Sequence, residues 1–248
     1  MNYYNENDPK AAAWLLELIR SGLIPDGKVD ERSIADVQPG DLEGFTQCHF
    51  FAGIGGWSYA LQLAGWPSDR PVWTGSCPCQ PFSVASNNKA EGTGDRRDLW
   101  SLFCELIGQR KPSTVFGEQV KNAISWAWWD RAKMDLEAKT YAAAAAVLRG
   151  DAIGAIHQRK RLYWVADSSG KGRERPEQAE CFSSRTEPKV SIDGYAFAKS
   201  RSAVEGDWSD LLLCHGLSIG MARIAIKGFG NAIIPQVAAQ FIRAYMET

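Results

Sequence analysis

Residues 47–64 read QCHFFAGIGGWSYALQLA, and the expected fold class follows from them. A short apolar run, residues 47–51, leads into a turn that contains Gly53, Gly55 and Gly56, and a run with helical spacing follows. A strand, a glycine turn and a helix in this order present backbone N–H groups and a helix N-terminus to a ligand. Many glycine turns are only tight turns, so the pattern predicts a βα unit and makes its turn a candidate cofactor site.

The same alternation continues on both sides of this stretch. Further strands are expected at 72–76, 114–116 and 161–165, and further helices at 99–109, 122–137 and 231–245. Residues 141–148 are rich in alanine, which favours a helix, but their place in the alternation favours a strand. Strands that alternate with helices predict an α/β fold: a Rossmann-like, mainly parallel sheet with helices on both faces.

The remaining segments suggest how the chain is organised. Asp8 and Pro9 are typical of a helix start, and Gly22 of a helix end, whereas residues 23–44 have the composition of a connector. We therefore divide the chain into an N-terminal helix and connector (1–45), a catalytic α/β domain (46–166), a reduced recognition segment (167–215), and a C-terminal part that returns to the catalytic domain (216–248).

Composition narrows the class of protein. The 248 residues are 45% hydrophobic, yet no apolar run is long enough for a membrane span and no secretion signal is visible at the start, so we expect a cytoplasmic protein without a membrane partner. Six irregularly spaced cysteines do not indicate a disulfide scaffold, and no metal site is expected. Residues 157–201 carry 10 Lys or Arg against 6 Asp or Glu, which fits either phosphate contacts or a solvated loop.

The strongest candidate for a reactive group is Cys79. It follows the expected strand 72–76, at the carboxyl end where open α/β sheets place their sites, and a proline lies on each side of the Cys79-Gln80 pair. A thiolate there would be a nucleophile if the site lowers the cysteine pKa or supplies a base. A lone cysteine is more often a small buried apolar residue, but its position at a strand end favours a nucleophile.

Three charged residues could face the same crevice as Cys79, at the carboxyl ends of the expected strands. Glu118 lies at the end of the expected strand 114–116, where a carboxylic acid could protonate a ring nitrogen. Arg159 and Arg161 are two residues apart, so on a strand both would point to one face and could hold a base oxygen, a phosphate or a carboxylate. Taken singly, each is also an ordinary surface residue.

Taken together, the motifs resemble the DNA cytosine-C5 methyltransferase family. Five runs occur in the family's order and span most of residues 48–245: Phe51-Ala52-Gly53-Ile54-Gly55-Gly56, Pro78-Cys79-Gln80-Pro81-Phe82-Ser83, Gly117-Glu118-Gln119-Val120, His157-Gln158-Arg159-Lys160-Arg161 and Gly230-Asn231-Ala232.

The resemblance implies a mechanism and a set of site residues. Cys79 would add to C6 of a cytosine in DNA, Glu118 would hold N3 and Arg161 the O2 edge, with Arg159 in support, and the base would have to leave the stack. S-Adenosylmethionine would be the methyl donor. Residues implied for the donor are Phe51, Ala52, Gly53, Ile54, Gly56, Pro78, Leu99 and Asn231, and those implied for the substrate are Gln80, Ser83 and Val120.

The chain departs from the family between Gly56 and Pro78. The family normally inserts two further strands and a helix there, which carry acidic residues that grip the adenosine, but residues 57–77 leave room for one helix and one strand. The first strand would then become a sheet edge, and the donor pocket would be truncated. His49 and Gln119 also replace the family's usual Asp and Asn.

Three explanations of this departure remain open. The chain is a compact methyltransferase whose pocket is completed by the acidic N-terminal region or a second subunit. It uses Cys79 for another C5 modification, on an already modified pyrimidine with a different donor. Or it is a non-catalytic DNA-binding or partner protein. Each reading expects association with DNA and hence with the nucleoid.

Overall fold

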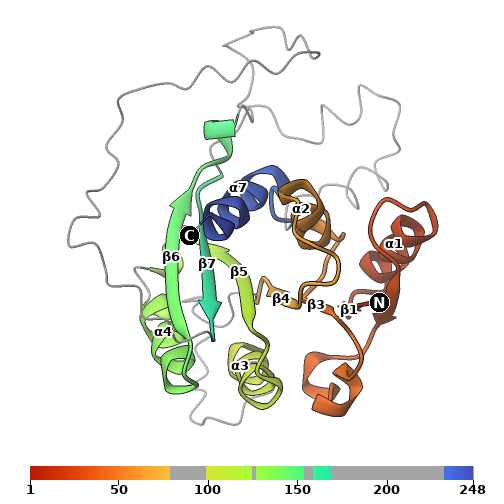
Figure 1. Cartoon of the computed structure of the whole chain (residues 1–248), viewed down its shortest axis with the longest axis horizontal. Helices are drawn as coiled ribbons and strands as arrows, with labels where there is room; N and C mark the ends of the chain where they lie inside the picture. Colours follow the sequence, from red (N-terminus) through yellow and green to blue (C-terminus); the bar gives the residue numbers. More distant parts are fainter. Residues whose placement is uncertain (79–98, 125–126, 154–158, 169–231, 248) are drawn as a thin grey trace, which may run out of the picture. The chain divides into compact units, whose positions relative to one another are not determined.

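One sheet organises the part of the chain that the structure describes. The computed structural model describes residues 1–78, 99–124, 127–153, 159–168 and 232–247 (Figure 1). The strands stand in the order β2-β1-β3-β4-β5-β7-β6; the first five are parallel, and β7 runs antiparallel to both of its neighbours. The strands are β1 (Asn2–Asn5), β2 (Gly27–Asp30), β3 (Gln47–Phe50), β4 (Val72–Gly75), β5 (Thr114–Val120), β6 (Ala142–Leu148) and β7 (Arg161–Asp167).

Helices cover both faces of this sheet, as the sequence predicted. In Figure 1, α2 and α7 lie side by side on one face, and α3 and α4 lie on the other. The helices are α1 (Pro9–Arg20), α2 (Gly56–Ala64), α3 (Leu99–Arg110), α4 (Trp128–Ala138) and α7 (Pro235–Met246), with short 3-10 turns η1 (Ile34–Asp36), η2 (Pro39–Leu42), η3 (Lys121–Ala123) and η4 (Gly150–Ile153).

Alternation along the strands builds a separate core on each face. In β4, Trp73 packs into the cluster with α3 and α4, while its neighbour Val72 packs into the cluster with α2 and α7. In β7, Trp164 and Tyr163 divide in the same way, and all four side chains are buried. Successive side chains of a strand point to opposite faces, so a sheet covered on both sides needs such continuous apolar runs.

The N-terminal region corrects our prediction. Residues 1–45 contain the expected helix, α1, which Asp8 caps by accepting hydrogen bonds from the backbone N–H groups of Lys10 and Ala11, but they also contain two strands that the interpretation as helix and connector missed. Strand β1 pairs in parallel with β3, and β2 pairs with β1. The strand before the glycine turn is therefore not a sheet edge, because two strands and a helix from earlier in the sequence stand beyond it.

The other expected elements form, with shifted boundaries. Residues 142–148 are the strand β6 despite their alanines, because they pair along their whole length with β7. Strand β5 extends to Val120, and α4 begins at Trp128 after the turn η3. Helix α7 belongs to the same compact unit as the sheet. Among the described residues, no helix combines the length and the apolar character needed to cross a membrane.

Candidate functional site

The glycine turn after β3 has a backbone that a ligand can approach. Phe51 has φ 51°, an uncommon value for a residue with a side chain, and Gly53 and Gly55 have φ 55° and 80°. Gly56 begins α2, and a Cβ atom at this position would lie 2.9 Å from Cγ1 of Ile233, so only glycine fits against that segment. The turn thus opens at the carboxyl end of β3, in front of the N-terminus of α2.

A carboxylate from the N-terminal region is fixed against this turn. Glu6 follows β1, and its Oε2 accepts a hydrogen bond of 2.8 Å from the backbone N–H of Gly53, while its Oε1 accepts one of 2.8 Å from the N–H of Asp8. The backbone N–H of Ala52 donates to the carbonyl of Asn5 over 3.0 Å. Because β1 and β3 pair in parallel, their carboxyl ends meet, and the bonds from Gly53 and Ala52 join them, while the bond from Asp8 fixes the Glu6 side chain.

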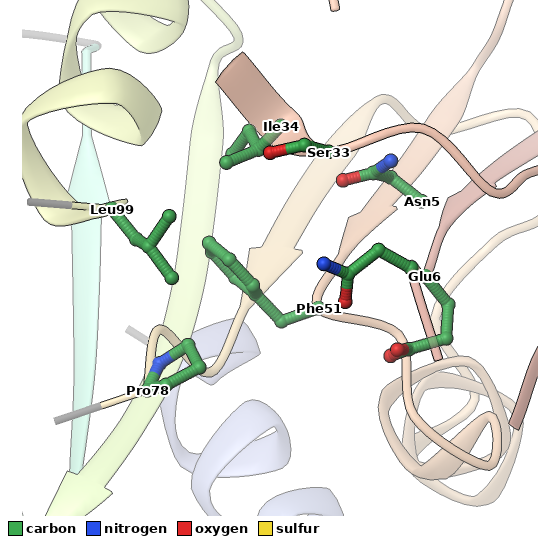
Figure 2. Close-up of a pocket in the computed structure, with 8 residues that line it drawn as sticks. Asn5, Glu6, Ser33, Ile34, Phe51, Pro78 and Leu99 are labelled. Carbon is green, nitrogen blue, oxygen red and sulfur yellow. The ribbon is translucent and has the colours of Figure 1, made fainter. Parts of the chain in front are cut away.

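A pocket lies where these ends meet. Figure 2 shows Phe51 in its middle, with Leu99 and Pro78 on one side and Asn5 and Glu6 on the other. The lining is apolar on the side of α3 and polar on the side of β1, with a carboxylate at the polar side. The lining residues are Asn5, Glu6, Asn7, Ser33, Ile34, Phe51, Pro78 and Leu99.

The acidic residue that ends β2 has a structural role. Asp30 is buried and accepts hydrogen bonds from the Tyr3 hydroxyl at 2.8 Å and from the Arg32 guanidinium at 2.6 Å. The hydrogen bonds from the Arg32 side chain lower the pKa of Asp30 to about 2. Arg32 also pairs with Asp41 at 2.8 Å, so the cluster fixes the segment that brings Ser33 and Ile34 to the pocket.

Glu118 occupies a second region, on β5. Its neighbour Gly117 lies opposite Trp164, and a Cβ atom there would be 2.1 Å from the indole, so glycine lets β7 pack directly on the backbone. The Glu118 side chain is only 9% exposed. Burial raises the pKa of Glu118, and the charges of Arg161 and Arg159 oppose that shift. A carboxyl group with a raised pKa can hold a proton near neutral pH.

The two arginines play different parts around Glu118. Arg161, the first residue of β7, places its Nε 2.9 Å from Glu118 Oε1 as an ion pair. Arg159 lies before the strand with φ 24°, so the expectation that both arginines alternate along one strand is wrong. Its Nη2 donates a hydrogen bond of 2.7 Å to the carbonyl of Ala232. Burial lowers the pKa of Arg159, and the positive charge of Arg161 adds to this effect.

Gln119 ties the two regions together. Its Nε2 donates a 3.0 Å hydrogen bond to the carbonyl of Cys77, two residues before Cys79 in the sequence. Its Oε1 accepts a 2.9 Å bond from the backbone N–H of Val120. Gln119 stands where the resembling family usually has Asn. Its side chain holds Cys77, just before the cysteine motif, against β5.

The structure brings together part of the predicted site. Phe51, Pro78 and Leu99 line the pocket, and Ala52, Gly53, Ile54 and Gly56 form the turn beside it. Glu118, Arg159 and Arg161 gather at β5 and β7, and Val120 pairs with Arg161 in register. Cys79, Gln80, Ser83 and Asn231 lie outside the described residues.

Sequence reasoning missed five pocket residues. Asn5, Glu6, Asn7, Ser33 and Ile34 all come from the segment interpreted as helix and connector. One signal was present: the aromatic pair Tyr3-Tyr4 runs directly into Asn5-Glu6-Asn7, as an apolar strand runs into a polar strand end.

Comparison with known proteins identifies the family. The model of the C-5 cytosine-specific DNA methylase family matches residues 67–200, which is more than half of the chain. No curated protein matches the sequence significantly.

Solved structures with a similar arrangement include a mutant of the Spodoptera frugiperda DNMT2, at 12% identity and a TM-score of 0.46, covering 72% of this chain and 53% of that one. The Dnmt2 methyltransferase of S. pombe is similar at 14% identity and a TM-score of 0.45, covering 70% and 52%. The methyltransferase EhMeth of Entamoeba histolytica is similar at 16% identity and a TM-score of 0.36, covering 70% and 55%. The chain thus spans about half the length of these structures. On the strength of the family model, the chain belongs to the C-5 cytosine-specific DNA methylase family.

Proposed function

We propose that the chain is a DNA cytosine-C5 methyltransferase that uses S-adenosylmethionine as the donor and Cys79 as the nucleophile. One observation carries this proposal: Glu6 is fixed against the glycine turn, where it supplies an acidic group on the donor side that the interval 57–77 lacks. The carboxyl ends of the parallel strands β1, β3, β4 and β5 lie at one edge of the sheet, so the pocket, Pro78 at the start of the cysteine motif, and Glu118 are reached from the same edge.

The residues of the pocket fit the donor. A carboxylate has about four lone-pair directions, so after accepting the bonds from Gly53 and Asp8, Glu6 can still accept bonds from two ribose hydroxyl groups. Phe51, Leu99 and Ile34 offer apolar surface to a flat base. When bound, S-adenosylmethionine would supply an electrophilic methyl group.

The residues at β5 and β7 fit the cytosine. The Cys79 thiolate forms a bond to C6, and the electron pair displaced from the C5–C6 double bond makes C5 nucleophilic. Burial raises the pKa of Glu118, which favours its role as the group that donates a proton to N3 and stabilises the developing negative charge on the ring. Arg161 donates to the O2 edge. After C5 is methylated, loss of the C5 proton expels the Cys79 thiolate and restores the double bond.

The alternative functions have less support than this proposal. The hypothesis of a donor other than S-adenosylmethionine rested on the absence of two strands between Gly56 and Pro78. Strands β1 and β2 occupy the positions in the sheet where those strands were expected. A second subunit is not needed to supply the acidic group, because Glu6 lies in the pocket. A non-catalytic DNA-binding protein has no need of a buried glutamate whose pKa is raised beside two arginines.

The test compares nucleosides from cells that express the wild type with those from cells that express Cys79→Ala. We expect 5-methylcytosine in DNA from the wild type only, measured by mass spectrometry of the digested DNA in a host that lacks its own cytosine methylation. A mass increment other than a methyl group that depends on Cys79 would support the alternative donor. DNA of unchanged composition in both would contradict every enzymatic reading.

Covalent capture gives a second readout. The purified protein should form a covalent complex with DNA that contains 5-fluorocytosine, and this complex should survive denaturation with detergent. We expect it only when S-adenosylmethionine is present, because fluorine cannot leave as the C5 proton does. Cys79→Ser serves as the matched control and should form no such complex. A complex that forms equally well with Cys79→Ser would contradict the role of the cysteine.

A further inference from the structure

The segment that follows Asn231 is held between the two regions of the site. Ile233 packs so closely on Gly56 that no side chain would fit at the glycine, and it is buried in the same cluster as Trp57 and Tyr163. Arg159 approaches the segment from the other region and bonds the carbonyl of Ala232 over 2.7 Å. Two consecutive residues, Ala232 and Ile233, thus contact the arginine motif of the base side and the glycine turn of the donor side.

The geometry of Arg159 allows it to hold the backbone carbonyl of Ala232 in place. Its backbone lies in the sparsely populated left-handed region, with φ 24°, so that the residue turns out of line with β7. The residue is partly buried, and its guanidinium is close enough to Glu118 and Arg161 for the charges of both to affect its pKa. A planar guanidinium with several fixed N–H donors can face Glu118 and hold a backbone carbonyl at the same time.

We propose that Arg159 is a positioning residue for the donor side: by holding Ala232 it fixes the backbone from which Ile233 packs on Gly56 at the glycine turn. The inference rests on the proposed function and gives Arg159 a task different from that of Arg161, although both belong to one motif. Arg161 faces the cytosine and acts on the chemical step, whereas Arg159 acts on donor affinity. The hydrogen bond from Arg159 to Ala232 also links the two regions, because Arg159 belongs to the motif that contacts the base.

The experiment measures the dissociation constant of S-adenosylhomocysteine by calorimetry in the absence of DNA. We expect Arg159→Gln to raise this constant on the order of tenfold, since a hydrogen bond from a charged donor is lost. Arg159→Lys keeps the charge but not the planar donor, and should raise it by about threefold or more. Arg161→Gln is the matched control and should bind S-adenosylhomocysteine as the wild type does.

Steady-state kinetics then separate positioning from general loosening. Arg159→Lys should raise KM for S-adenosylmethionine with little change in kcat, and Arg161→Gln should lower kcat with little change in KM. If either folded Arg159 variant binds S-adenosylhomocysteine as the wild type does, the inference is overturned; Arg159→Lys decides alone if Arg159→Gln does not fold. If the wild type itself does not bind S-adenosylhomocysteine, the donor assignment fails instead, which is a distinguishable result.

Discussion

The two regions of the site differ in how the sequence encodes them. Glu118 and Arg161 come from motifs in which the functional side chain and the strand around it are neighbours in the sequence, and Glu118 also has Gly117 before it. The pocket proposed for the donor is assembled from the start of the chain, the segment after β2, the glycine turn, Pro78 and the beginning of α3. The first region could be found by reading along the chain. The second exists only once β1 has paired with β3.

That pairing also explains the short interval between Gly56 and Pro78. In doubly wound sheets of the order 3-2-1-4-5, the strand before the glycine turn comes first in the sequence, and the two strands beyond it come second and third. Here the spatial pattern is β2-β1-β3-β4-β5, so the same two positions are filled by strands that come before the glycine turn. The order along the chain differs, and the arrangement in space is retained.

A substitution that disables the base region should leave the donor region intact. Glu118→Gln cannot supply a proton to N3, so we expect the single-turnover rate of methylation to fall about 10²–10⁴-fold. The affinity for S-adenosylhomocysteine, measured by calorimetry, should stay within about a factor of two. A variant that loses both in parallel would show that the two regions are not separable.

A substitution of Glu6 tests the donor region in the same way. Glu6→Ala removes the acceptor for the ribose and for the Gly53 N–H, so we expect the dissociation constant of S-adenosylhomocysteine to rise about 10–100-fold. Glu31→Ala is the control, because Glu31 is an exposed carboxylate at the end of β2 that does not line the pocket. Equal affinities for the two variants would contradict the role given to Glu6.

Much of the fold was readable from the sequence, and the reason for the failures is physical. The strand at 142–148 was predicted correctly against its alanines, because alternation of elements outweighs the weak preference of alanine for helix. Strands β1 and β2 were missed because each has four residues with no alternating pattern, and their pairing partners are distant in the sequence. Arg159 was placed on a strand because spacing alone cannot show that its backbone turns away before β7 begins.

The centre of the sheet, where β3 pairs with β1 and β4, should respond to acid. His49 on β3 stacks on the ring of Tyr4 in β1 at 5.0 Å, and its Nδ1 lies 2.8 Å from the hydroxyl of Thr74 in β4. Burial lowers the pKa of His49 to about 3, so the folded protein keeps the ring neutral while the unfolded chain binds a proton below its ordinary pKa near 6.5. Stability should therefore fall as the pH drops below about 6.5, and continue to fall until about pH 3.

Urea unfolding at two pH values measures this effect. Between pH 7.5 and 5.5, His49 should account for a loss of about 1 kcal/mol in the free energy of unfolding, which His49→Gln should not show. The difference between the two proteins removes the contribution of all other titrating groups. An identical pH dependence in wild type and variant would mean that His49 is not held neutral in the folded protein.

Amide hydrogen exchange with and without S-adenosylhomocysteine tests most directly whether the N-terminal strands complete the donor pocket. The pocket lining predicts that the ligand slows exchange at residues 5–8 and 33–36 as well as at the glycine turn, residues 51–56. Protection confined to residues 51–56, with none at the end of β1 or after β2, would contradict the claim that β1 and β2 supply the half of the pocket absent between Gly56 and Pro78.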